Sequence, residues 1–160
     1  MDHRVFISLG TNLGNRVSNL SAAQKALAPE MRLVRASSIF ETEPWGFQEQ
    51  PPFLNQVLEM DTALFPPQTL LVFVKTLEIK LGREQTFHYG PRLIDIDILL
   101  YDMLMMDTPD LIIPHPQLPD RAFVLVPLAE IAPNLKHPVL NMAIIDLLQK
   151  IDQKGIRQYP

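Results

Sequence analysis

Two aspartates, Asp95 and Asp97, interrupt an otherwise apolar run, GPRLIDIDILL. If this run is a strand, both side chains point to one face, with β-carbons roughly 6–7 Å apart. Two carboxylates at that spacing repel each other unless one is protonated or a cation lies between them. Oxygen ligands without a neighbouring His or Cys favour Mg²⁺, and two Mg²⁺ ions about 3.5–4 Å apart suit phosphoryl-type transfer. The alternative is an ordinary strand edge that carries two solvated aspartates.

Basic side chains flank this run. Arg92 precedes it and Arg83 follows an expected helix, and arginine suits multi-point contact with phosphate. His115 stands between two prolines that restrict its backbone, so it is a candidate phosphate contact. Arg121 follows in the segment PDRAF. The alternatives are solvated surface arginines and a turn histidine bonded to the backbone.

Aromatic residues gather in a second segment, ETEPWGFQEQPPFLN, which contains Trp45, Phe47 and Phe53. Aromatic side chains in a Pro-rich loop suit stacking on a flat ring. Asn55 would share a strand face with Phe53 and offers both a donor and an acceptor. This pairing suits a heterocycle with an amide-like edge. The alternative is that these aromatics close the end of the core.

Residue periodicity predicts the elements that position these side chains. Alternation predicts strands over about residues 4–10, 31–41, 53–64 and 92–101, and helical spacing predicts helices over about 18–27 and 66–81. Two short extended pieces and two further helices, near 124–129 and 141–151, follow. In the last main strand, Ile94, Ile96, Ile98 and Leu100 are expected to face the core, with Leu93, Leu99 and Tyr101 beside the aspartates.

The order strand, helix, strand, strand, helix, strand is that of a ferredoxin-like βαββαβ sandwich, an α+β fold. Its helices lie on one face of an antiparallel sheet, and a C-terminal extension follows. We expect one domain over residues 1–160.

Composition narrows the classes of function. The net charge of −4 disfavours a general nucleic-acid-binding protein. The chain has no cysteine, which excludes disulfide frameworks, thiolate zinc sites and cysteine nucleophiles. No apolar run reaches the roughly 18 residues of a membrane helix, and no signal peptide is visible, so a membrane is not expected as a partner. From the net charge, a nucleic acid is not expected as a partner either. We expect a cytoplasmic protein.

Together these segments resemble one family, the 6-hydroxymethyl-7,8-dihydropterin pyrophosphokinases of folate biosynthesis. The resemblance covers roughly residues 4–137, through ISLGTNLGN, ETEPWGFQEQPPFLN, LEIKLGR, YGPRLIDIDILLY and IPHPQLPDRAFVLVPLAEIAP. It implies the ferredoxin-like fold and transfer of pyrophosphate from ATP to the hydroxymethyl group of the pterin, with release of AMP. It also implies two Mg²⁺ ions, with ATP and the pterin as small-molecule substrates.

The resemblance assigns roles residue by residue. Asp95 and Asp97 are similar to the ligands of the two Mg²⁺ ions. Catalytic and ATP-binding positions of the family are matched by Lys75, Glu78, Arg83, Arg92, Ile98, His115 and Arg121. Pterin-pocket positions are matched by Thr42, Pro44, Trp45, Phe53, Asn55, Tyr89 and Phe123. The alternative for Glu78 is a surface pair with Lys75.

One segment departs from the family pattern. Between Arg83 and Gly90 the chain reads EQTFHY, without the further arginine and the tryptophan that the family often carries there. Tyr89 can still stack on a ring and cover the site as part of a lid. The missing arginine affects the expected affinity for ATP and not the expected reaction.

The charge count is compatible with an acidic protein. Fully ionised ATP carries about −4, the aspartates add −2 and two Mg²⁺ supply +4, which leaves roughly −2 for Arg83 and Arg92 to offset. Two other classes remain: a metal-dependent phosphohydrolase that uses the same aspartates, and a ligand-binding module without catalysis. We expect a monofunctional enzyme that is a monomer or a weak homodimer.

Overall fold

The computed structural model describes residues 2–44, 49–82 and 93–160. Its elements are, in order, β1 (His3–Thr11), α1 (Arg16–Leu27), β2 (Met31–Ala36), β3 (Phe40–Thr42), β4 (Phe53–Thr62), α2 (Pro67–Lys80), β5 (Asp95–Tyr101), β6 (Met106–Asp107), β7 (Ile112–Ile113), the 3-10 helix η1 (Leu118–Asp120), α3 (Ala122–Ile131), α4 (Ile144–Gln149) and β8 (Ile156–Gln158).

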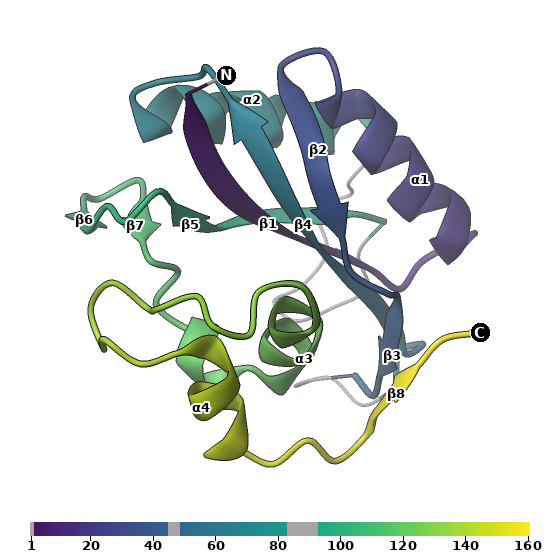
Figure 1. Cartoon of the computed structure of the whole chain (residues 1–160). Coiled ribbons are helices and arrows are strands. Elements are labelled where there is room, and N and C mark those ends of the chain that lie inside the picture. The colour runs from purple at the N-terminus through teal and green to yellow at the C-terminus, as the bar shows by residue number, and fades with distance from the viewer. Residues whose placement is uncertain (1, 45–48, 83–92) are drawn as a thin grey trace.

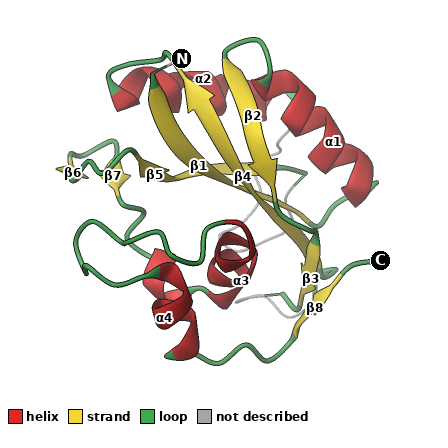
Figure 2. Cartoon of the chain, in the orientation of Figure 1, coloured by secondary structure: helices red, strands yellow, loops and turns green. Residues whose placement is uncertain are grey.

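Among these residues, six strands form one sheet in the order β5-β1-β4-β3-β8, and β2 pairs with β4 beside this path (Figure 2). Every pair in this sheet is antiparallel. The strands β6 and β7 form a separate hairpin. The predicted ferredoxin-like βαββαβ order is therefore confirmed, and β5, which carries the two aspartates, is an edge strand.

Two apolar clusters cover the two faces of this sheet. The first packs α1 and α2 against one face, and it includes Ile7, Leu20, Leu70 and Ile96. The second packs α3 and α4 against the other face, and its members include Val57, Leu125 and Leu147. The two helix pairs accordingly lie on opposite sides of the sheet in Figure 1. The C-terminal extension thus builds a second layer of helices that a βαββαβ unit lacks.

The predicted strand over residues 31–41 is interrupted at Ser37. The Ser37 N–H donates to the carbonyl oxygen of Val57 at 2.9 Å. In return the Val57 N–H donates to the Ser37 hydroxyl oxygen at 2.9 Å, so a side chain takes the place of a backbone acceptor. The chain consequently leaves β2 and re-enters the sheet as β3. Both strands still pair with β4.

A β-bulge shifts the register between β1 and β5. Ile98 and Leu100 pair with consecutive residues of β1, so Leu99 is the extra residue. Leu99 and Leu100 therefore both join the second cluster, whereas Tyr101 joins the first. The prediction that Leu100 faces the same core as Ile98, with Tyr101 on the aspartate face, is wrong because strict alternation ends at this bulge.

The helix boundaries follow local chemistry. Asn15 caps α1, with its side-chain oxygen accepting from the Ser18 N–H at 3.1 Å. Pro66 and Pro67 begin α2, and Gly82 follows its end with a φ of 89°.

The C-terminal helix α4 is shorter than predicted, and β8 is a strand that periodicity did not predict. None of the described helices is long and apolar enough to cross a membrane.

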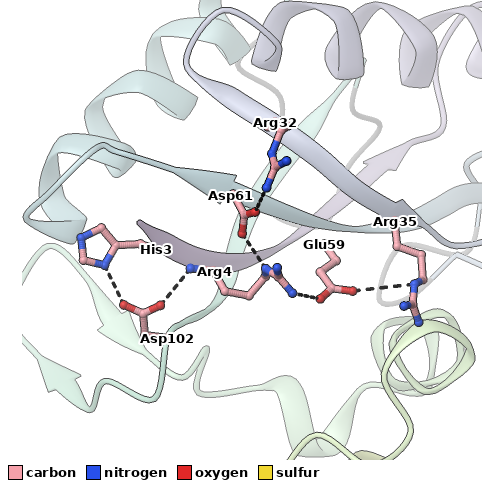
Figure 3. Close-up of polar contacts among 7 residues, drawn as sticks. All are labelled: His3, Arg4, Arg32, Arg35, Glu59, Asp61 and Asp102. Atoms are coloured by element: carbon pink, nitrogen blue, oxygen red, sulfur yellow. Dashed lines mark hydrogen bonds and ion pairs between the residues drawn. The ribbon is translucent and has the colours of Figure 1, made fainter. Parts of the chain in front are cut away.

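Ion pairs occupy one end of the second face of the sheet, as Figure 3 shows. The Arg4 guanidinium contacts both Glu59 and Asp61, with Nε 2.6 Å from Asp61. Arg32 reaches the other oxygen of Asp61 at 2.6 Å, and Arg35 lies 3.9 Å from Glu59. The Arg4 hydrogen bond holds the pKa of Asp61 below its ordinary value. These ion pairs cover the part of the second sheet face at this end that the second apolar cluster does not cover.

Candidate active site

The opposite end of the same face carries the predicted site residues. Asp95 pairs with Gly10 of β1, and Gly10 pairs with Asn55 of β4, so these residues form one row across three strands. Asp97 pairs with Ser8, two residues along β1. Directly paired residues of antiparallel strands point to the same face. The row therefore joins the acidic pair to the amide that was predicted for heterocycle recognition.

Gly10 forms the floor between the two halves of the site. A β-carbon at this position would lie 3.3 Å from Asn55 Oδ1 and 3.9 Å from Phe53 Cδ1. Because glycine has none, no methyl group stands against the amide oxygen, and the backbone allows close approach of a flat ligand. Gly10 is not among the residues predicted from the sequence to form the site. The signal that could have identified it is a glycine inside a predicted strand, because such a glycine weakens the strand and often marks a place where a ligand approaches the backbone closely.

The Asn55 amide has a defined orientation. Its Nδ2 donates to Thr42 Oγ1 at 2.9 Å, and both side chains are buried. Its other end, Oδ1, faces Gly10. The amide therefore offers an acceptor on the side of the aspartate row. Thr42 itself pairs with Phe53 across β3 and β4, which brings three predicted pterin residues together.

Glu78 of α2 connects the helix to the aspartate strand. Its side chain is only 2% exposed. Its Oε2 accepts from the Ile96 N–H at 2.7 Å, and Oε1 lies 3.2 Å from Lys75 Nζ. Since β5 is an edge strand, this carboxylate supplies an acceptor that a further strand would otherwise supply. Glu78 is thus paired with Lys75, but it is not a surface residue.

His115 lies in the loop between β7 and η1, with its own N–H donating to the Leu99 carbonyl at 2.9 Å. Nδ1 accepts from the Gln117 N–H at 3.2 Å, so the neutral ring carries its proton on Nε2. Burial lowers the pKa of His115, and the charges of Arg121 and Lys75 lower it further, while Asp97 raises it. Side chains from four separate segments thus interact at the Asp97 end of the row.

Arg121 and Phe123 stand at the start of α3. The Arg121 guanidinium donates to Gln117 Oε1 and lies 5.4 Å from the centroid of the Phe123 ring. Phe123 is half-buried and packs against the second apolar cluster. The same helix terminus therefore carries a cation and an aromatic ring beside the sheet.

Comparison with known proteins identifies the family of this chain. Residues 6–133 match the family described as 7,8-dihydro-6-hydroxymethylpterin-pyrophosphokinase (HPPK). The chain belongs to this family.

Relatives of known name share most of the chain. The 2-amino-4-hydroxy-6-hydroxymethyldihydropteridine pyrophosphokinase of Methylorubrum extorquens is 40% identical over 157 residues, which are 97% of this chain and 98% of that protein. The enzyme of the same name from Aquifex aeolicus is 43% identical over 84% of both chains. The folic acid synthesis protein fol1 of Pneumocystis carinii is 40% identical over 96% of this chain, which spans only 21% of that longer protein.

A solved structure shares the fold. The HPPK-DHPS of Plasmodium falciparum with pteroate superposes with a TM-score of 0.79 at 17% identity, and it covers 98% of this chain and 46% of that chain. The family assignment therefore rests on sequence, and this likeness supports the architecture.

The turn between β1 and α1 fastens the segments that flank the site of this HPPK-family protein. Thr11 Oγ1 donates to the Leu93 carbonyl at 2.5 Å. Asn12 Nδ2 donates to Gln50 Oε1 at 2.8 Å and to the Pro51 carbonyl at 3.0 Å. Thr11 and Asn12 are both buried, and they hold two distant segments in place.

The functional roles of all the site residues remain predictions. Trp45, Arg83, Tyr89 and Arg92 lie outside the described residues. Ile98 is 4% exposed and packs in the first apolar cluster, on the face away from the aspartates. Within residues 2–44, 49–82 and 93–160, no three His, Asp, Glu or Cys side chains gather as a metal site.

Proposed function

We propose that this protein transfers the pyrophosphoryl group of ATP to the hydroxymethyl group of 6-hydroxymethyl-7,8-dihydropterin and releases AMP. Membership of the HPPK family supports this reaction. The observation that carries it is the row of Asp95, Gly10 and Asn55, because it joins a phosphate-side pair of carboxylates to a heterocycle-reading amide on one surface.

The pterin is proposed to lie over Gly10. Asn55 Oδ1 would accept from an N–H group on the edge of the ring, since Nδ2 is already bonded to Thr42. Phe53 and Phe123 would contact the ring faces, with Trp45, Pro44 and Tyr89 assigned here by resemblance. An amide whose orientation is fixed in advance rejects a ring edge of the wrong polarity, because a buried polar group would be left unbonded.

ATP is proposed to bind at the Asp97 end. Lys75, His115 and Arg121 are donors from three different segments, and Arg83 and Arg92 are the further candidates. The neutral His115 ring would donate from Nε2 to a phosphate oxygen, because Nδ1 already accepts from Gln117. Asp95 and Asp97 would hold two Mg²⁺ ions, since two carboxylates on one face provide hard oxygen ligands. The ions would neutralise charge on the transferred group.

In the proposed reaction the pterin hydroxyl oxygen forms a bond to the β-phosphorus of ATP. The bond from that phosphorus to the oxygen bridging to the α-phosphorus breaks, AMP leaves with the electron pair, and the hydroxyl proton passes to solvent. Phosphoryl transfers of this kind have loose transition states, so positioning and charge stabilisation supply most of the acceleration. The contribution of this chain is to hold the hydroxyl group and the phosphate in line on one surface.

The deciding experiment mixes protein, Mg²⁺, ATP and the pterin and separates the nucleotides by chromatography. AMP should appear only when both the pterin and Mg²⁺ are present. A phosphohydrolase would release ADP or phosphate without the pterin, and a binding module would leave ATP intact. Either outcome contradicts the proposal.

A cytoplasmic location and a monomeric or weakly dimeric state remain predictions from the sequence.

A further inference from the structure

The C-terminal strand β8 lies beyond the family match at residues 6–133, yet it borders the pterin side of the site. Ile156 pairs with Thr42 of β3, and Figure 1 shows the two strands side by side near the C-terminus. The Tyr159 N–H donates to the Ile39 carbonyl at 2.8 Å, and the Glu43 N–H donates to the Gly155 carbonyl at 3.3 Å. Thr42 is therefore held between β4 and β8, and not on an exposed edge.

Glu41 fastens this strand by its side chain. Its Oε1 accepts from Arg157 Nη2 at 2.5 Å, and its Oε2 accepts from Arg16 Nη1 at 2.7 Å. Arg16 also donates to the Pro52 carbonyl at 3.0 Å, and its guanidinium lies 5.5 Å from the centroid of the Tyr159 ring. Glu41 and Arg16 together thus connect α1, β3, the residue before β4 and the C-terminal segment.

The consequence reaches the ligand through a single hydrogen bond. Strand β3 has only three residues, and its last residue, Thr42, accepts the Asn55 amide at 2.9 Å. A shift of β3 would release this contact and allow the amide to rotate. The C-terminal segment also shares a wall with the site, because Thr42, Arg121, Phe123, Lys154 and Ile156 line one groove of about 450 Å³.

We infer that β8 is a positioning element for the pterin: through the Arg157–Glu41 pair it fixes Thr42, and through Thr42 it fixes the orientation of the Asn55 amide. This inference rests on the proposed function, in which Asn55 reads the pterin edge. In the proposed binding mode Arg157 contacts neither substrate and acts through Glu41 and Thr42, so its replacement should change pterin affinity alone. Asp95 and Asp97 of the proposed ATP side stand on β5, which lies at the opposite edge of the sheet from β8.

The test is Arg157→Glu, which places a third carboxylate beside Glu41 and Glu43. Pterin affinity is measured by calorimetry in the presence of Mg²⁺ and a methylene analogue of ATP, and affinity for the analogue is measured alone. We expect pterin affinity to fall by roughly fivefold and analogue affinity to stay within about twofold. Arg157→Lys, which keeps the charge, should retain most of the affinity. Arg32→Glu is the matched control, because it reverses the charge of an exposed arginine that pairs with Asp61 at the far end of the same sheet.

A double variant separates positioning from general destabilisation. In a Thr42→Val background the amide contact is already lost, so Arg157→Glu should weaken pterin binding no further. Additive losses, equal losses with Arg32→Glu, or unchanged pterin affinity would overturn the inference. Wild-type protein that binds the pterin but releases no AMP contradicts the proposed reaction alone, and the variant titrations still decide on Arg157. Wild-type protein that binds no pterin overturns both.

Discussion

Oε2 of Glu78 lies 2.7 Å from the backbone nitrogen of Ile96, the residue between Asp95 and Asp97. The carboxylate is buried and comes from α2, whereas the strand it holds is the edge of the sheet. A helix side chain therefore contacts the backbone between the two aspartates, on the side where no strand among the described residues pairs with β5. The acidic pair is supported by the βαββαβ core itself.

Replacing Glu78 tests this support. Glu78→Ala would leave the Ile96 N–H without this acceptor, at a cost of about 1–3 kcal/mol in the free energy of unfolding. Turnover should fall as well, because the strand start that carries Asp95 and Asp97 loses its lateral contact. Denaturant unfolding and AMP release measure the two effects. Glu130→Ala is the matched control, since Glu130 accepts from the Ser38 N–H away from the site and should affect stability only.

Removing one carboxylate tests the phosphate side. Asp97→Ala should abolish AMP formation at any Mg²⁺ concentration while the circular dichroism and the unfolding midpoint stay close to those of wild type, because the side chain is partly exposed at a strand edge. Asp107→Asn removes an exposed carboxylate from β6 and should leave turnover unchanged. Unaltered turnover of Asp97→Ala at saturating Mg²⁺ would refute the assignment of this residue to the metal.

A methyl group at Gly10 tests the floor of the pterin side. The added β-carbon would lie 3.3 Å from Asn55 Oδ1, so Gly10→Ala should cover the acceptor that reads the ring. We expect KM for the pterin to rise by roughly tenfold, in line with the loss of one hydrogen bond of about 1.4 kcal/mol. The KM for ATP, measured in the same assay, serves as the internal control. A parallel rise in both would show that the substitution distorts the sheet instead.

A buried histidine predicts how stability depends on pH. His137 Nδ1 accepts from the Val139 and Leu140 N–H groups, and burial lowers the pKa of His137 below its ordinary value of 6.5. Below that pH the unfolded chain takes up a proton that the folded chain does not, so the free energy of unfolding falls as the pH falls. Asn at this position keeps an acceptor but cannot titrate.

The free energy of unfolding of wild type and His137→Asn should therefore be compared in urea between about pH 7 and about pH 5. Wild type should lose up to about 1.4 kcal/mol per pH unit more than the variant over part of this range. The carboxylates titrate in both proteins, so their contribution cancels in the difference. Parallel curves would mean that His137 takes up its proton equally in both states.

Local pattern accounts for most of the fold. Alternation over residues 4–10 and 53–64 and helical spacing over 66–81 predict β1, β4 and α2. The two strands place residues in both apolar clusters, and the helix packs one side in the first cluster. The pattern fails where a side chain or an extra residue replaces regular pairing, as at Ser37 and at the bulge beside Leu99. It also misses β8, whose three residues are too few and too exposed to show alternation.

The site was predictable to the extent that its residues are close in sequence. Spacing places Asp95 and Asp97 on one face, and the structure agrees. The pairing of Asp95 with Gly10, and of Gly10 with Asn55, depends on cross-strand register, which separates residues by more than forty positions. The contact between Glu78 and Ile96 depends on how α2 packs against the sheet edge. Neither relationship leaves a mark in the local sequence.

The row through Gly10 has a consequence for the size of the substrate. Neighbouring strands lie roughly 4.8 Å apart, so the backbones at Asp95 and Asn55 are held roughly 10 Å from each other with one strand between them. In the proposed binding mode, the sheet therefore fixes the distance between the edge of the heterocycle and the phosphate to be transferred. A molecule with a longer or shorter body would carry its hydroxyl past the phosphorus or short of it. This selection by length is set by backbone hydrogen bonding, so side-chain substitutions cannot retune it.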